Sequence, residues 1–317
     1  MSVPPAADPI PSERAGERPV GRPRVARYDG RTMAAPRLRF FLAALIAMLA
    51  ETLGSSAARA EPRRRATAAA RAKAAKALQE KLASMKERIE SGGEGLLEAL
   101  AEARALGAEA APLAPTIEAL LKGGATVPVM LAAIETCAVL RTPSSSAPIG
   151  GYLRHRSPAL RHAAVRALPL TGGPEAVTAL REGLRTNDEE VRGAAAEGLG
   201  QLGAEGALED LYQALERGLA AAAPAIGALC KGEACEGLAR RADALEAASL
   251  AAGFDEIFFR PSPLPEEVLV RLVERLRAHG RQEVDAYLAR VASRWPATGS
   301  PRVARALAAP AAEDGGT

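Results

Sequence analysis

The side chains that most often do chemistry in proteins are few in this chain, and they are scattered. The 317 residues include three histidines, His155, His162 and His279, and three cysteines. No histidine belongs to a His-Glu or His-x-x-x-His motif, and no cluster supplies the four ligands of a structural zinc site. The sequence also contains no glycine-rich phosphate loop and no nucleophile motif. We therefore expect no catalytic residue, no metal ligand and no bound cofactor.

Two of the cysteines, Cys230 and Cys235, are close in sequence. The first is expected to end one helix and the second to begin the next, which places the two thiols near each other. In an oxidising compartment such a pair can form a disulfide that closes the turn. The alternative is a pair of small core residues, since free cysteine is often buried.

The other chemically distinctive group is a basic cluster. It consists of Arg154, His155, Arg156, Arg161, His162 and Arg166. Because Arg161 recurs 31 residues later as Arg192, we expect it to be structural and to reach an acidic loop group of a neighbouring unit. The remaining members are expected to form a solvated face rather than an anion site.

A repeat positions these residues. When residues 157–187 are aligned with residues 188–218 without a gap, eight positions are identical. In each unit a stripe of apolar residues at helical spacing is followed by a glycine and a second stripe, which predicts a helix, a tight turn and another helix. Gly172 and Gly203 are expected to end the first helix in a left-handed conformation. A single pair leaves one apolar face uncovered, so such units stack in arrays.

The unit resembles the HEAT repeat, in particular the short form found in phycobilisome lyase-type proteins. Residues 158–168 (PALRHAAVRAL) and 191–200 (VRGAAAEGLG) carry the resemblance, since both read apolar-Arg, a pair of alanines, and leucine near the helix end. Ser157 and Asp188 stand where an N-cap is expected. The resemblance implies an all-α fold, a right-handed α-α superhelix of helix pairs with an extended concave face. It implies no chemistry.

Residues 1–60 form a leader of different composition. They hold nine of the 41 Lys and Arg residues and five of the 38 acidic residues, so the remaining chain has a net charge of −1 and does not favour nucleic-acid binding. An arginine-containing segment, the apolar run 40–50 and the small-residue site Ala58–Ala60 follow in the order of a secretory signal peptide. We expect translation to start at Met33, cleavage after Ala60, and export to the periplasm. The alternative is an uncleaved anchor.

The remaining chain is expected to have four parts. They are a basic amphipathic helix (61–92), HEAT-like repeats (93–250), a C-terminal helical cap (251–309) and a disordered tail (310–317). The first helix is expected to cap the repeats, with contact of residues 63–89 to anionic lipid as an alternative. The Phe-rich stretch 251–265 is expected to break the array, either as a hydrophobic plug or as an exposed aromatic patch for a partner.

Without a catalytic site, the expected function is binding. We expect an exported scaffold that binds a protein or peptide partner, and no nucleic acid, along the concave face of its second helices. The partner-binding residues expected there are Thr178, Arg181, Glu182, Arg185, Glu209, Tyr212, Gln213 and Glu216, whose mixed charge favours a polypeptide over a polyanion. One alternative is a chaperone-like or lyase-like helper that loads a prosthetic group and uses Tyr212 as an aromatic anchor. The other is an envelope-associated structural protein attached through residues 61–92.

Overall fold

The computed structural model describes residues 70–309, and all regular structure in that range is helical. The predicted signal peptide, its cleavage site and the tail 310–317 lie outside the described residues. Contacts divide the chain into two units, 1–71 and 72–317, and the second unit contains the helical array.

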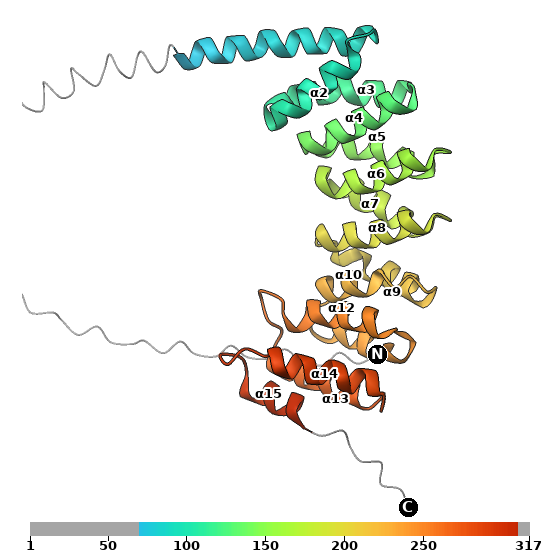
Figure 1. Ribbon diagram of the computed structural model, residues 1–317, viewed down its shortest axis with the longest axis vertical. Helices are drawn as coiled ribbons and strands as arrows, with labels where there is room; N and C mark the ends of the chain where they lie inside the picture. Colours follow the sequence, from blue (N-terminus) through green and yellow to red (C-terminus); the bar gives the residue numbers. More distant parts are fainter. Residues whose placement is uncertain (1–69, 310–317) are drawn as a thin grey trace, which may run out of the picture. The chain divides into compact units, whose positions relative to one another are not determined.

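The second unit is a stack of helix pairs in chain order (Figure 1). The first helices of the pairs are α2 (Leu96–Leu106), α4 (Val127–Leu140), α6 (Pro158–Thr171), α8 (Glu189–Gln201), α10 (Ala222–Leu229), α12 (Ala247–Phe258) and α14 (Gln282–Arg294). The second helices are α3 (Ala114–Gly123), α5 (Ser146–Gly150), α7 (Gly173–Gly183), α9 (Leu208–Glu216), α11 (Glu236–Ala239), α13 (Glu266–Arg277) and α15 (Pro301–Ala308). Each first helix packs against the first helix of the next pair, and the second helices form the other layer, the second-helix layer. The all-α prediction of stacked helix pairs is confirmed.

The central repeat forms the elements that its pattern predicts. Gly172 and Gly203 follow α6 and α8 with φ of 72° and 65°, in the left-handed region where glycine has no Cβ to clash. The Asp188 side chain caps α8 by accepting a hydrogen bond from the backbone N–H three residues later, at 3.2 Å. Ser157 occupies the N-cap position of α6 as predicted, but its side chain makes no capping hydrogen bond. Its own N–H donates to His155 Nδ1 at 3.0 Å instead.

One apolar seam runs between the two helix layers. The two central units contribute equivalent residues, all 1% exposed or less: Leu160, Leu168 and Leu180 from one, and Val191, Leu199 and Leu211 from the next. The paired alanines of the motif let the first helices approach closely, since Ala164 and Ala195 are fully buried. The repeat is therefore a packing motif, in which each unit covers the face that its neighbour leaves open.

The expected break in the array at residues 251–265 is wrong. Helix α12 crosses the expected boundary after residue 250 and packs against α10 as the first helix of a further pair. Phe254 and Phe258 are buried, with ring centroids 6.3 and 6.5 Å from that of Tyr287, so they are core and not an exposed patch. Gly253, which resembled a helix breaker, lies where α12 crosses α10: a Cβ there would lie 3.0 Å from the Ala223 carbonyl oxygen.

The first described helix covers residues 70–91, and its C-terminal half caps the array. Met85 and Ile89 are buried, and Arg88 donates to Glu102 of α2 at 2.8 Å. Lys73, Lys76 and their neighbours on its N-terminal half are exposed, and contact with lipid stays a prediction. Across residues 70–309, no helix combines the length and the apolar character that a bilayer span requires.

Candidate binding surface on the second helices

Seven of the eight residues predicted to bind a partner are exposed or half-buried in the second-helix layer. On α7 and its C-terminal end these are Thr178, Arg181, Glu182 and Arg185, and on α9 they are Glu209, Gln213 and Glu216. They recur every three or four residues, which gives each helix one polar stripe. The structure thus brings these seven side chains to one layer of two consecutive repeats.

Two of the arginines in these stripes also hold the repeats together. Arg181 Nε donates to Asp210 Oδ2 at 2.6 Å, and Arg185 donates to Asp210 Oδ1 at 2.7 Å. The Asp210 side chain is only 8% exposed, so its charge must be compensated locally. Both arginines therefore fix α9 on α7 while their outer surfaces stay in solvent.

The same arrangement recurs in the next repeats, where Glu236 is the buried acid. Arg271 Nε and Arg275 Nε of α13 lie 2.9 and 2.8 Å from the two carboxylate oxygens of Glu236. The pKa of Glu236 is lowered, and the main cause is the hydrogen bond from Arg271. Neither buried acid was predicted from the sequence. Both clamps use two arginines four residues apart, a spacing that favours one side of a helix but does not indicate which acid is buried.

Tyr212 is the exception among the predicted residues, because it is buried. Its hydroxyl donates to the Ala234 carbonyl at 2.7 Å, and the Arg241 guanidinium lies 4.7 Å from its ring centroid. Burial raises the pKa of Tyr212 to about 12. Its predicted role at the binding surface is wrong: the ring fills the space between α9 and α11. The prosthetic-group alternative therefore loses its aromatic anchor.

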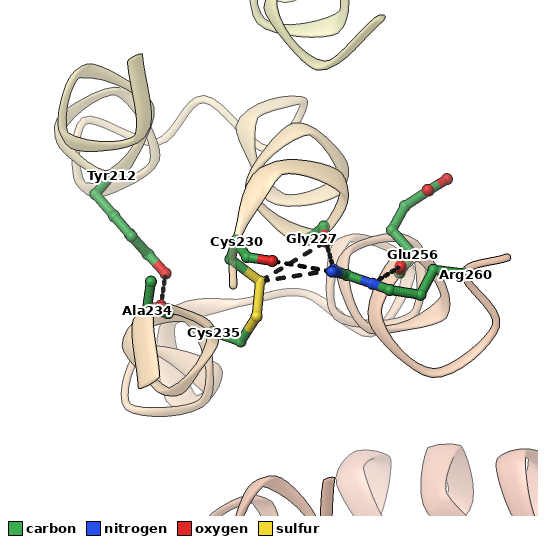
Figure 2. Close-up of a disulfide and its surroundings, with 7 residues drawn as sticks. All are labelled: Tyr212, Gly227, Cys230, Ala234, Cys235, Glu256 and Arg260. Carbon is green, nitrogen blue, oxygen red and sulfur yellow. Dashed lines mark hydrogen bonds between the residues drawn. A yellow bond between two sulfur atoms is a disulfide. The ribbon is translucent and has the colours of Figure 1, made fainter. Parts of the chain in front are cut away.

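The turn that Tyr212 contacts contains the cysteine pair. Cys230 and Cys235 are joined, with an S–S distance of 2.05 Å and a Cα–Cα distance of 5.0 Å (Figure 2). Arg260 of the next pair donates to the carbonyl oxygens of Cys230 at 3.0 Å and Gly227 at 2.5 Å. The disulfide thus lies at a junction to which three successive helix pairs contribute. Cys137 is a buried free thiol, and burial raises its pKa to about 11.

A shallow groove of about 460 Å³ lies beside the exposed stripe of α7. Its lining includes small residues, among them Gly150, Gly151 and Ala179, and the exposed Glu175 and Glu182. A Cβ on Gly150 would lie 2.8 Å from the Ala179 Cβ, so small residues bring α5 and α7 close together. The groove offers backbone and carboxylate groups to a bound chain.

The basic cluster predicted from the sequence is divided by the fold. Arg161 donates to Asp188 Oδ2 through Nε at 2.8 Å and through a terminal nitrogen at 2.6 Å, which confirms its predicted reach to an acidic loop group. His162 Nε2 lies 3.1 Å from the same oxygen, and Arg166 lies 3.4 Å from Glu190. Arg154, Arg156 and Arg166 are exposed, and His155 is half-buried. Arg154 lies 3.6 Å from Glu182.

Residues 70–309 contain no group of three or more His, Cys, Asp or Glu side chains placed to hold a metal ion. The three histidines serve structural contacts instead. His155 accepts from the backbone, His162 lies against Asp188, and His279 Nδ1 lies 2.7 Å from Asp243.

The family model of HEAT repeats matches residues 113–198 and again residues 147–230. Residues 113–230, which span α3 to α10, are accordingly HEAT repeats. No curated protein matches the chain. Among solved structures, a designed armadillo repeat protein is similar, with 16% identity, coverage of 71% of this chain and 96% of that chain, and a TM-score of 0.37. The narrower likeness to phycobilisome lyase-type proteins stays a prediction.

Proposed function

We propose that this protein is an exported scaffold that binds a protein partner through the exposed stripes of α7 and α9. The observation that carries the proposal is that side chains on those helices are held in place by ion pairs and are still exposed to solvent. Arg181 and Arg185 are held by Asp210, although their side chains are 47% and 61% exposed. A surface already ordered in the free protein loses less conformational entropy on binding, which favours affinity.

The composition of the surface supports a polypeptide partner. Thr178 and Gln213 offer neutral hydrogen-bonding groups, while Glu182 and Arg185 supply both signs of charge. Such a surface matches the polar mixture of a protein rather than the uniform charge of a polyanion. The adjacent groove by Gly150 gives an extended segment access to backbone groups.

The test is site-specific photocrosslinking in the cells that make the protein. A photoreactive residue is placed at Gln213 of α9 and, separately, at Gln201 of α8. The two sites are matched, because each glutamine is exposed and donates to a glutamate four residues earlier, at 3.2 and 3.0 Å. Gln213 lies in the second-helix layer and Gln201 in the other layer.

We expect one discrete protein adduct from the Gln213 site and none from the Gln201 site. Equal adducts from both sites would contradict a specific binding face. So would the absence of an adduct from the Gln213 site in cells where the protein is abundant. A small-molecule adduct at Gln213 would instead favour the prosthetic-group alternative.

Export is the second part of the proposal. It is supported by the order of parts in residues 33–60, and the Cys230–Cys235 disulfide fits an oxidising compartment. Mass spectrometry of the mature protein from fractionated cells is expected to find it in the periplasm with Glu61 as its first residue. Thiol titration of that protein, denatured without reductant, is expected to give one thiol, that of Cys137. Three thiols or a retained leader would contradict the proposal.

A further inference from the structure

Two consecutive grooves lie between repeats at equivalent positions, 31 residues apart. The first, of about 620 Å³, is lined by residues that include Arg154, Arg161 and Asp188. The second, of about 280 Å³, is lined by residues that include Arg185, Arg192, Arg217 and Leu219. Three positions correspond across the two grooves at a distance of one repeat: Arg154 with Arg185, Arg161 with Arg192, and Asp188 with Leu219.

The half-buried arginine of each groove adopts the same local contact. A terminal nitrogen of Arg161 donates to the carbonyl six residues earlier at 3.0 Å, and that of Arg192 does so at 3.1 Å. In the first groove the guanidinium of Arg161 is also paired with Asp188. In the second groove, Leu219 occupies the position of that acid and is itself buried.

The second groove is therefore cationic without an acid to balance it. Arg192 and Arg217 have no acidic partner within 4.0 Å among residues 70–309, and only Arg185 is paired, through Asp210. A half-buried guanidinium keeps strong donors for a carboxylate, which it binds in a bidentate manner. The first groove adds Arg156, which is exposed and also unpaired within the described range.

We infer that the second groove binds a carboxylate side chain of an acidic polypeptide segment. This carboxylate pairs with Arg192 as Asp188 pairs with Arg161 in the first groove. A second carboxylate of the same segment contacts Arg156 in the first groove, beside Arg154, which lies 3.6 Å from Glu182. Successive helices pack about 8–10 Å apart. An extended polyproline II segment advances about 9 Å in three residues and returns to the same face. The geometry thus points to acidic residues at positions i and i+3.

Charge complementarity selects a polypeptide over nucleic acid. The groove beside α7 shares Leu153, Arg154 and Thr186 with the first inter-repeat groove, and Glu175 and Glu182 also line it. A strand with a phosphate on every nucleotide would place charges against both glutamates. A peptide with separated carboxylates avoids them. This inference rests on the proposed function, since it names the chemistry of the protein partner.

Fluorescence anisotropy of the full mature protein tests the inference. The probe is a fluorescein-labelled peptide of repeated Glu-Pro-Ala triplets, and the matched probe carries Gln in place of Glu. The test variants are Arg192→Gln and Arg217→Gln. The control is Arg305→Gln on α15, which removes the same charge from an exposed arginine whose side chain bonds only its own helix. Arg217 is exposed and forms no ion pair within residues 70–309, so Arg217→Gln keeps the fold intact.

We expect the Glu probe to bind the wild type and each test variant to weaken binding by about tenfold, the scale of one charged hydrogen bond. The control variant and added neutral peptide are expected to leave affinity unchanged, and added salt to reduce it. Leu219→Asp is expected to supply the acid internally and to abolish binding of the probe.

Three results overturn the inference. They are no binding of the Glu probe to the wild type, equal binding of the Gln probe, or binding of a single-stranded oligonucleotide as tight as that of the Glu probe. If the protein adduct forms at Gln213 in cells but the Glu probe does not bind the wild-type protein, the inference fails and the scaffold proposal stands. If the probe binds as expected but no adduct forms, the scaffold proposal fails.

Discussion

At the scale of single residues, Arg141 is the only residue other than glycine with a positive φ among residues 70–309. It ends α4 with φ of 53°, the left-handed region, at the position where Gly172 and Gly203 end the next two first helices. A side chain in this conformation costs roughly 1 kcal/mol relative to glycine. We expect Arg141→Gly to raise the free energy of unfolding by roughly 0.5–1 kcal/mol, measured by urea denaturation.

The control for Arg141 separates conformation from charge. Arg141→Ala removes the same charge from this exposed position but keeps a Cβ. It is expected to give no gain in stability. A gain of equal size in both variants would show that charge, and not the left-handed backbone, is the cause.

Asp188 is the residue through which acid is expected to weaken the repeat. Burial alone raises the pKa of its carboxyl, but hydrogen bonds from Arg161, from the Val191 N–H and from His162 outweigh burial and hold the pKa at about 2. The unfolded value is near 4. The stabilisation is therefore complete above about pH 4 and is lost as the pH falls towards 2, with a size on the order of 2 kcal/mol.

The Asp188→Asn variant tests that pH window. Its free energy of unfolding is expected to fall less steeply than that of the wild type between about pH 4 and pH 2. Urea titrations at several pH values measure the difference, with Glu197→Gln on the exposed face of α8 as the control. Parallel pH profiles for Asp188→Asn and the wild type would contradict a stabilising role of the Asp188 carboxylate.

The residue scale also shows what the sequence could not reveal. The exposed stripe of α7 and α9 could be predicted, because period and polarity alone decide which side of a helix faces solvent. The burial of Tyr212 and Asp210 could not, because it depends on the short α11 and on the register between repeats. A tyrosine and an aspartate at surface spacing look the same whether the next repeat covers them or not.

At the scale of elements, glycines bring α10 and α12 into close contact. A Cβ on Gly227 would lie 2.0 Å from the Gly253 carbonyl oxygen, a contact that no backbone adjustment within the helix removes cheaply. We expect Gly227→Ala to separate the two helices and to lower the free energy of unfolding by several kcal/mol, on the order of 2–4. Thermal and urea denaturation measure the loss.

Gly206 provides the matched control for Gly227. A Cβ there meets nothing within 4 Å, and its φ is not in the left-handed region. Gly206→Ala is expected to leave stability within about 0.5 kcal/mol of the wild type. Similar losses in both variants would mean that α10 and α12 tolerate separation.

The same crossing explains why some elements could be predicted and others could not. Helices with a strong apolar stripe, such as α13 and α14, lie within the predicted C-terminal helical cap. The sequence of α12 predicts a break because glycine and a nearby proline-rich stretch are typical of loops. Its glycine instead serves a close helix contact, which is a tertiary requirement that a one-dimensional pattern does not reveal. Helix α15 also lies within the predicted cap: Val303 and Leu307 are buried, and the helix packs on α13 and α14.

At the scale of the whole array, residues 72–309 are bound by contacts between neighbours. The Arg-acid clamps, the Tyr212 contact and the disulfide junction each connect adjacent pairs of the second-helix layer or the turn beside it. Stability in such a protein is close to a sum of repeat and interface contributions. Removal of a terminal pair should therefore weaken its neighbour without unfolding the far end.

Truncation after residue 280 tests this nearest-neighbour behaviour, because it removes α14 and α15 and uncovers Phe254 and Phe258. We expect greater binding of a hydrophobic dye and a loss of at least about 3 kcal/mol, the cost of losing one large buried aromatic contact. Truncation after residue 300 removes only α15 and should cost less. Helix content, measured by circular dichroism, should fall only by the share of the deleted residues. Complete loss of helix in the shorter chain would show instead that the array folds only as a whole, and its repeats could not then be treated as separate units of binding.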